Sequence, residues 1–269
     1  MIETRVLGTE PRGGALVDDI VFVGPDDLDV EAYLVRPAEA ATRDAGGATG
    51  AAARAGILMW HWLDSEAPDG NRTQYLDEAA DLAAAGTICL LPQGRFPWSQ
   101  PPTGSTADAV AIRAEVARLR AGLDLLAARH DVDPARLGVV GHDFGGMLAA
   151  VEGADEDRVK ALVLVAAAPR WADWFLLFWD IEEDRIDYLR AIRPLDPIEC
   201  IGRAAPAEVL LQFGRSDFYI AAMSGLEFKV RAPKGTELLP YDSGHDMRLA
   251  RIVSDRRAFL ARTLGLADD

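Results

Sequence analysis

The positions of apolar residues divide the chain into alternating strand-like and helix-like segments. Two short alternating runs, at 18–24 and 29–36, flank a Gly-Pro-Asp-Asp turn and predict an antiparallel hairpin at the start of the fold. The pattern then changes to a fully apolar run at 56–60, a helical segment near 74–85 and another apolar run at 87–92. This order predicts a βαβ unit.

The later part of the chain continues this alternation. A long amphipathic stretch at about 107–129 predicts a helix, because its apolar residues recur near helical spacing. Further apolar runs follow, each with a helix-capable segment after it, at 136–141, 159–168, 207–214 and 236–241. Continuous apolar runs suit parallel strands that are covered on both faces. We therefore predict a single α/β domain over 1–269 with a mostly parallel, doubly wound sheet.

Two segments interrupt the pattern. Residues 38–55 are rich in Ala and Gly without apolar periodicity and predict an exposed connection. Residues 170–203 are too long for one ordinary crossover and are rich in aromatic residues. These aromatics either pack against the domain or form a small helical cap over an apolar pocket, and the two interpretations are compatible. We expect a cap between the sixth and seventh strands, and its pocket residues are Trp174, Phe178, Trp179 and Tyr188.

The clearest chemical motif lies where the strand at 136–141 meets the next helix. Its sequence, GHDFG, places Asp143 between flanking glycines, as in the sharp turn that exposes a nucleophile at a sheet edge. The residue after the nucleophile, Phe144, then offers its backbone N–H to a developing oxyanion. A second N–H is expected from the first βα loop, with Trp62 as first choice and Leu63 as second. The structural alternative makes Asp143 a helix N-cap.

Two later loops supply partners for this carboxylate. Asp217 follows the strand at 207–214, and His245 follows the strand at 236–241. Taken separately, the first is a common turn residue and the second a common solvated side chain. Together they complete the order nucleophile, acid, base, each just beyond the carboxyl end of a strand. This order favours a catalytic triad.

The other histidines are weaker candidates. Of the four in the chain, only His245 follows the last strand. His61 and His142 lie near the expected site, where they either orient substrate or make structural hydrogen bonds. His130 is expected at an exposed helix end.

Composition narrows the classes of function. The formal net charge of −15 disfavours binding to nucleic acid or to an anionic membrane. The two cysteines lie in separate segments and imply no disulfide framework, which together with the lack of a signal-like start predicts a cytoplasmic protein. We find no dinucleotide fingerprint, P-loop or metal-ligand cluster, so neither a cofactor nor a metal is predicted. We expect a small-molecule substrate as the partner. The sequence does not decide the oligomeric state, and a homodimer is one possibility.

The motifs give the chain a resemblance to the α/β-hydrolase superfamily over about residues 18–265. Its βα order, with FGRSDFYI and YDSGHDM, is most similar to the dienelactone hydrolase-like branch, which carries Cys or Ser as nucleophile. The turn GHDFGG is instead similar to that of haloalkane dehalogenases and epoxide hydrolases, in which an aspartate attacks carbon. Such dehalogenases usually have Trp where this chain has Phe144, and such epoxide hydrolases use two cap tyrosines where this cap offers Tyr188.

A carboxylate nucleophile changes the expected chemistry, because it is ionised at neutral pH and needs no base to attack. We predict that Asp143 forms an aspartyl ester with a small, largely apolar epoxide or organohalide. Water activated by His245, which Asp217 orients, then hydrolyses that ester. One alternative is an esterase or lactonase in which Asp143 acts as a base. Another is a non-hydrolytic isomerase or a binding protein that keeps the fold.

Overall fold

The computed structural model describes residues 3–38, 53–64, 66–67 and 69–266. Most of the exposed connection predicted at 38–55 therefore lies outside the described residues. In the described part of the chain, no helix combines the length and the hydropathy needed to cross a membrane.

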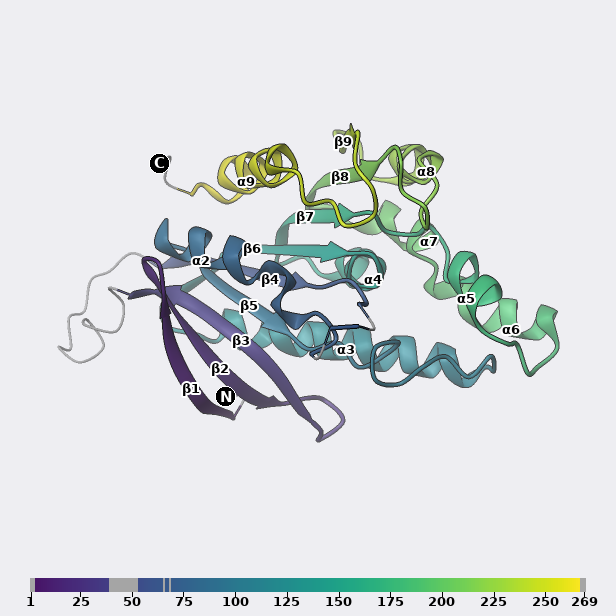
Figure 1. Ribbon diagram of the computed structural model, residues 1–269, viewed down its shortest axis with the longest axis horizontal. Coiled ribbons are helices and arrows are strands. Elements are labelled where there is room, and N and C mark those ends of the chain that lie inside the picture. Colours follow the sequence, from purple (N-terminus) through teal and green to yellow (C-terminus); the bar gives the residue numbers. More distant parts are fainter. Residues whose placement is uncertain (1–2, 39–52, 65, 68, 267–269) are drawn as a thin grey trace.

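Among the described residues, nine strands form one sheet in the order β1-β2-β3-β5-β4-β6-β7-β8-β9 (Figure 1). Neighbours from β1 to β5 along this order pair antiparallel, and all pairs from β5 onward are parallel. This confirms the predicted mostly parallel α/β architecture. The strands are β1 (Thr4–Arg12), β2 (Ala15–Val23), β3 (Asp29–Pro37), β4 (Arg54–Trp60), β5 (Ile88–Pro92), β6 (Val132–His142), β7 (Val159–Val165), β8 (Glu208–Gly214) and β9 (Glu237–Tyr241).

The predicted N-terminal hairpin is the pair β2–β3, whose register runs from Ala15 opposite Pro37 to Val23 opposite Asp29. The structure adds β1, which the sequence pattern does not predict. Every residue of β1 is exposed, so it has no buried face that would impose a period of two on its apolar residues. It is held by main-chain pairing with β2 at the edge of the sheet.

Helices cover both faces of the parallel strands (Figure 1). α2 and α9 are joined by an ion pair between Glu78 and Arg256, and α3 packs against α4 on the opposite face. β4 and β7 are buried at nearly every position, as expected for strands between two helical layers. The helices are α2 (Leu76–Ala84), α3 (Ala107–Ala127), α4 (Phe144–Glu152), α5 (Ala172–Phe178), α6 (Arg185–Ile192), α7 (Pro197–Cys200), α8 (Met223–Arg231) and α9 (Ala250–Leu264).

The segment between β7 and β8, residues 170–203, folds into α5, α6 and α7. Figure 1 shows α5 and α6 projecting beyond the carboxyl ends of the parallel strands. Trp171 and Phe175 are fully buried, and the Trp171 indole donates to the Leu195 carbonyl at 2.7 Å. Part of the aromatic content of this segment therefore forms core. We keep the name cap segment for residues 170–203.

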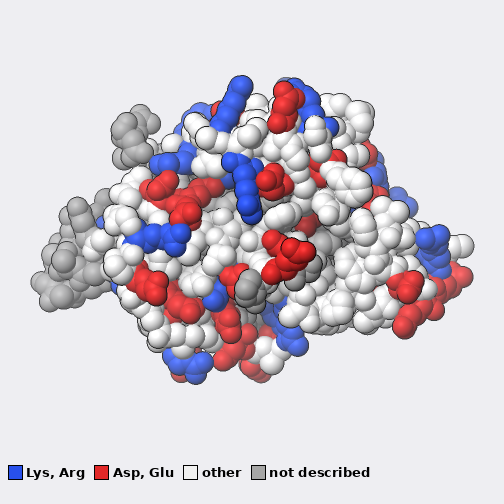
Figure 2. All heavy atoms as spheres, viewed as in Figure 1, with Lys and Arg blue, Asp and Glu red and all other residues white. Residues whose placement is uncertain are grey.

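Charged side chains of both signs are distributed over the molecule. Figure 2 shows Asp and Glu interleaved with Lys and Arg on the face viewed in Figure 1. Several of the basic groups are held by carboxylates, such as Arg120 by Glu152 at 2.9 Å and Arg158 by Glu156 at 2.6 Å. These Arg side chains are therefore neutralised by neighbouring carboxylates within the same molecule.

Candidate active site

The turn between β6 and α4 holds Asp143 in an uncommon backbone conformation. Its φ is 54° and its ψ is −119°, and its side chain is buried. A Cβ on Gly141 would lie 2.3 Å from the carbonyl oxygen of Gly145, and a Cβ on Gly145 would lie 2.5 Å from that of Trp60. Both positions therefore require glycine, as the sharp nucleophile turn does.

The structure brings together the three side chains that the sequence predicts. His245 Nδ1 lies 2.9 Å from Asp217 Oδ2, and His245 Nε2 lies 3.9 Å from Asp143 Oδ2. The other oxygen of Asp217 accepts the backbone N–H groups of Tyr219 and Ile220, at 2.8 and 2.9 Å. These bonds fix the Asp217 carboxylate, which in turn orients the imidazole between two acids.

The electrostatics of this group favour an ion pair. Burial alone lowers the pKa of His245, but the hydrogen bond to Asp217 and the negative charges of Asp143 and Asp217 raise it to about 9. Burial raises the pKa of the Asp143 carboxyl above its ordinary value, whereas His245 and the backbone N–H groups of Phe144 and Leu63 act in the opposite direction. The acidic groups on both sides of the ring therefore favour the imidazolium form of His245.

One oxygen of the central carboxylate is unengaged. Asp143 Oδ1 is buried and has no hydrogen-bond partner among the described residues. The N–H groups of Phe144 and Leu63 face this carboxylate and favour its charged form. The prediction that the Trp62 N–H is the second oxyanion donor is wrong, because this N–H donates to Gln74 Oε1 at 2.8 Å. The Leu63 N–H, the second choice, stays the predicted second oxyanion donor.

A chain of hydrogen bonds supports the loop that carries the imidazole. Gln74 receives the Trp62 N–H, and its amide nitrogen lies 2.6 Å from His142 Nδ1. His142 Nε2 lies 2.8 Å from the carbonyl oxygen of His245. Burial holds the pKa of His142 well below its ordinary value, so the ring is neutral, with Nδ1 accepting and Nε2–H donating. His142 thus positions the His245 loop, and nothing in the sequence pattern marks Gln74 as its partner.

His61 has a structural role of the same kind. Its Nε2 accepts the Gly94 N–H at 3.1 Å, and its Nδ1 lies 3.0 Å from the carbonyl oxygen of Trp62. Burial lowers the pKa of His61 to about 4, which keeps the ring neutral. Both ring nitrogens are occupied, so His61 shapes the first βα loop and leaves no group free for substrate.

A cavity of about 270 Å³ opens at Asp143 and His245. Among the described residues, no group of three or more His, Cys, Asp or Glu is arranged to hold a metal ion. The wall combines aromatic rings with carboxylates and contains two of the four cap residues that the sequence predicts. Besides Asp143 and His245 it consists of Trp62, Leu63, Asp64, Glu66, Phe144, Trp174, Trp179 and Tyr219.

The other two cap predictions are not met. Tyr188 is fully buried and its hydroxyl donates to Asp108 Oδ2 at 3.0 Å, which ties α6 to the start of α3. Phe178 is half exposed and packs on the outer side of Trp174, with ring centroids 5.0 Å apart. Tyr219, which follows Asp217 by two residues, lines the cavity instead. No periodic or motif signal in the sequence distinguishes this tyrosine.

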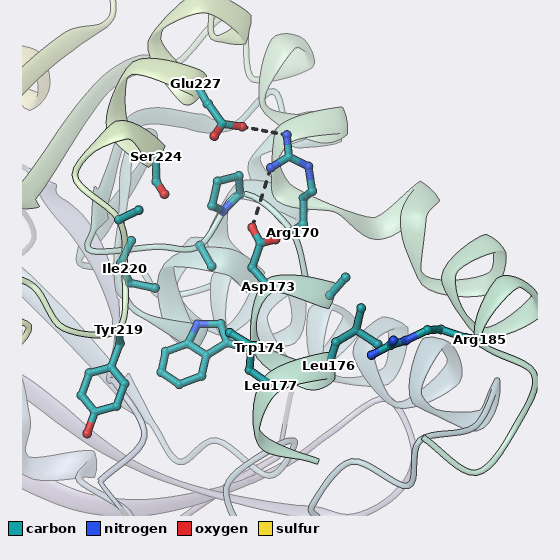
Figure 3. A pocket seen from close by; sticks show the side chains of 14 residues that line it. Arg170, Asp173, Trp174, Leu176, Leu177, Arg185, Tyr219, Ile220, Ser224 and Glu227 are labelled. Atoms are coloured by element: carbon teal, nitrogen blue, oxygen red, sulfur yellow. Dashed lines mark hydrogen bonds and ion pairs between the residues drawn. The ribbon is translucent and has the colours of Figure 1, made fainter. Parts of the chain in front are cut away.

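A second, larger groove of about 680 Å³ lies beside this cavity and shares Trp174 and Tyr219 with it (Figure 3). The rings of these two residues stack with centroids 5.4 Å apart. In the groove, the guanidinium of Arg170 is held by Glu227 at 2.7 Å and by Asp173 at 3.7 Å. The groove and the cavity are therefore lined by different charges.

No protein-family model matches the chain, and no curated protein matches it. Solved structures do. An acetyl xylan esterase from Paenibacillus sp. R4 aligns with a TM-score of 0.76 and 16% identity over 97% of this chain and 88% of that one. One from Thermoanaerobacterium sp. JW/SL YS485 aligns with a TM-score of 0.73 and 18% identity over 97% and 87%. The alpha/beta hydrolase GrgF from Penicillium sp. sh18 aligns with a TM-score of 0.67 and 14% identity over 93% and 99%.

This chain has the α/β-hydrolase fold. At these identities the likeness is one of architecture, and it extends over nearly the whole chain. The α/β-hydrolase fold accounts for the place of Asp143, Asp217 and His245, because it gathers the loops after successive parallel strands at one edge of the sheet. It leaves the chemistry to the residues that occupy those loops.

Proposed function

We propose that the protein hydrolyses a small, largely apolar electrophile, an epoxide or an organohalide, through a covalent ester on Asp143. The observation that carries this proposal is the state of the Asp143 carboxylate. It sits in the nucleophile turn with Oδ2 toward His245 and with Oδ1 buried and unpaired among the described residues. A serine or cysteine at this position would need a base within hydrogen-bond distance, whereas an ionised carboxylate does not.

In the first step Asp143 Oδ1 attacks an sp³ carbon. A C–O bond forms, the bond from that carbon to halide or ring oxygen breaks, and the electron pair leaves with the departing atom. An opened epoxide oxygen also needs a proton. Tyr219 carries the only hydroxyl among the described residues that line the cavity, and it takes the place that the sequence prediction gave to Tyr188.

In the second step water attacks the carbonyl carbon of the aspartyl ester and gives one proton to His245. The bond from that carbon to the alkyl-bearing oxygen breaks, the product leaves as an alcohol with the proton from His245, and Asp143 is regenerated with one oxygen from water. Formation of the ester removes the negative charge of Asp143, which is one of the causes that raise the pKa of His245 to about 9. The pKa of His245 therefore falls, the imidazolium releases its proton to the departing epoxide oxygen or to solvent, and the neutral imidazole can then accept a proton from water. The N–H groups of Phe144 and Leu63 are placed to stabilise the oxyanion that forms on the ester.

A second candidate is an esterase or lactonase, in which Asp143 acts as a base that activates water. It is favoured by the structural neighbours, two of which are acetyl xylan esterases. It also agrees with the resemblance of the FGRSDFYI and YDSGHDM segments to the dienelactone hydrolase-like branch. In this candidate no covalent intermediate forms on the protein.

A single turnover in ¹⁸O-water, with a panel of epoxides, organohalides and esters, separates the two. If an aspartyl ester forms, water attacks the ester carbonyl, so the label enters Asp143 and the first product carries unlabelled oxygen from the protein. Label found only in the product supports the base mechanism. Absence of turnover with every member of the panel supports a non-hydrolytic member of the fold.

A further inference from the structure

The wall of the candidate active-site cavity carries negative charge that no described Lys or Arg side chain of the wall neutralises. Asp64 and Glu66 line the cavity together with Asp143, and no described Lys or Arg does. The one cationic group in the wall is His245, and it is already matched by carboxylates on both ring nitrogens. Neither Asp64 nor Glu66 forms an ion pair with another described residue.

Apart from Leu63, the rest of the wall is aromatic. Trp62, Trp174, Trp179 and Tyr219 all border the cavity. Trp62 stacks on His142 with 7° between the ring planes, and Trp174 stacks on Tyr219, so these ring orientations are fixed by their neighbours. The face of an aromatic ring attracts a cation through its quadrupole, and several rings around one space form the cage that binds alkylammonium groups.

The state of Asp143 is an independent observation that points in the same direction. Its side chain is 1% exposed and its Oδ1 has no partner among the described residues, although it borders the cavity. An unpaired carboxylate oxygen in a partly dehydrated space is unfavourable, and a cation close to it relieves that cost.

The surroundings of the cavity agree with this charge preference. Asp64 also lines an adjoining hollow of about 480 Å³, to which Glu31 and Asp69 add carboxylates. Arg170 lies in the groove that shares Trp174 and Tyr219 with the cavity, where Figure 3 shows it between Glu227 and Asp173. On the side of the hollow, Arg72 lies 3.6 Å from the Glu31 carboxylate. Among the described residues that line the hollow and the cavity there is no Lys or Arg.

We propose that the epoxide or organohalide, otherwise apolar, bears one ammonium group, either quaternary or a protonated amine, that binds between the aromatic rings and the carboxylates of Asp64 and Glu66. This inference rests on the proposed function for the assignment of the cavity as the active site. It also implies that anionic substrates are excluded, because the same carboxylates repel them.

Calorimetric titration at fixed ionic strength with two probes of equal shape tests the proposal. Choline carries the quaternary nitrogen, and 3,3-dimethylbutan-1-ol has a carbon in its place. We expect choline to bind about tenfold more tightly than the alcohol, and the preference to shrink to about threefold or less in the Asp64→Asn/Glu66→Gln variant. The variant Asp157→Asn/Glu208→Gln removes the same charge at exposed positions near the amino ends of β7 and β8, and it should keep the full preference.

Equal binding of the two probes to the unmodified protein, or an unchanged preference in Asp64→Asn/Glu66→Gln, would overturn the inference. The covalent chemistry is tested separately by incubating His245→Gln with (2-bromoethyl)trimethylammonium and with 1-bromo-3,3-dimethylbutane. If both bromides alkylate Asp143 at the same rate, the proposed function stands and the ammonium inference fails. If choline is preferred but neither bromide reacts, the ammonium inference stands and the covalent mechanism fails.

Discussion

At the scale of single residues, the central feature is Asp143, whose backbone conformation and buried charge are both energetically unfavourable. Asp143 has a positive φ, which costs roughly 1–3 kcal/mol for a non-glycine residue, and its charge is buried. Strain and burial of this kind persist where the surrounding structure imposes them, as the glycines at 141 and 145 and the pair with His245 do here. The sequence motif predicts the turn around Asp143, which the structure shows, because such a turn tolerates few sequences; the role of Asp143 as nucleophile stays a prediction.

The coupling between the two groups predicts the behaviour of a variant that resembles the ester. Asp143→Asn is neutral, so it removes one of the causes that raise the pKa of His245 to about 9. We expect the pKa of His245 in this variant, measured by NMR titration of the imidazole, to fall toward its ordinary value of about 6.5. Asp242→Asn, in the same loop but paired with Arg215 at the surface, should leave the pKa near 9. An unchanged pKa in Asp143→Asn would contradict the proposed second step.

The same shift makes the free energy of unfolding depend on pH. Because the pKa of His245 is raised in the folded protein, its protonation stabilises the fold fully below the unfolded pKa of about 6.5, and this contribution is lost as pH rises toward 9. Between pH 6 and pH 9.5, urea unfolding of the wild type should therefore lose up to about 3 kcal/mol relative to His245→Gln. Parallel pH profiles for the two proteins would show that His245 is not held as an imidazolium.

At the scale of elements, most strands and helices were predictable and most connections between side chains were not. β4, β7 and β8 are continuous apolar runs that only a sheet covered on both faces accommodates. β1 escaped prediction because all its residues are exposed. The bond from Tyr188 to Asp108 depends on how α6 docks against α3, which no local pattern encodes. The choice of Leu63 over Trp62 depends likewise on Gln74.

The hydrogen-bond chain from the first βα loop to the His245 loop gives a test at this scale. Gln74→Ala leaves the buried Trp62 N–H and His142 Nδ1 without their partner, so both loops lose a constraint. We expect kcat on the active electrophile to fall about tenfold with little change in KM, because the substrate cavity itself is intact. Gln100→Ala removes an exposed glutamine and is the control. A rise in KM with an unchanged kcat would instead assign Gln74 a role in substrate binding.

At the scale of the whole molecule, the two helical layers are joined to the sheet by buried polar groups as well as by the apolar core. Arg256 of α9 forms a buried ion pair with Glu78 of α2 and also donates to Gln212 of β8 at 2.8 Å. The fold is shared with two acetyl xylan esterases and the alpha/beta hydrolase GrgF at 14–18% identity, so the architecture tolerates extensive replacement of sequence. The predicted doubly wound sheet rests on the apolar pattern of many strands and helices, whereas the proposed substrate rests on a few side chains of the site.

The buried pair gives the stability prediction at this scale. Glu78→Gln leaves the Arg256 charge buried and uncompensated, so we expect the free energy of unfolding to fall by about 3–5 kcal/mol. Asp81→Asn, which removes the exposed partner of Arg257 on the same two helices, should cost less than about 1 kcal/mol. Urea denaturation of the two variants measures both values. Similar losses of unfolding free energy in Glu78→Gln and Asp81→Asn would show that the buried pair stabilises the fold no more than the exposed one.

The most direct measurement of the central claim is the intact mass of His245→Gln after incubation with the electrophile panel. Without a base to activate water, the aspartyl ester should accumulate. The mass should then rise by that of the whole epoxide, or by that of the alkyl group less one hydrogen for a halide. Peptide mapping should place the adduct on Asp143, and Asp143→Asn/His245→Gln should stay unmodified. An unmodified His245→Gln protein that still converts a panel member, or an adduct at another residue, would contradict the account.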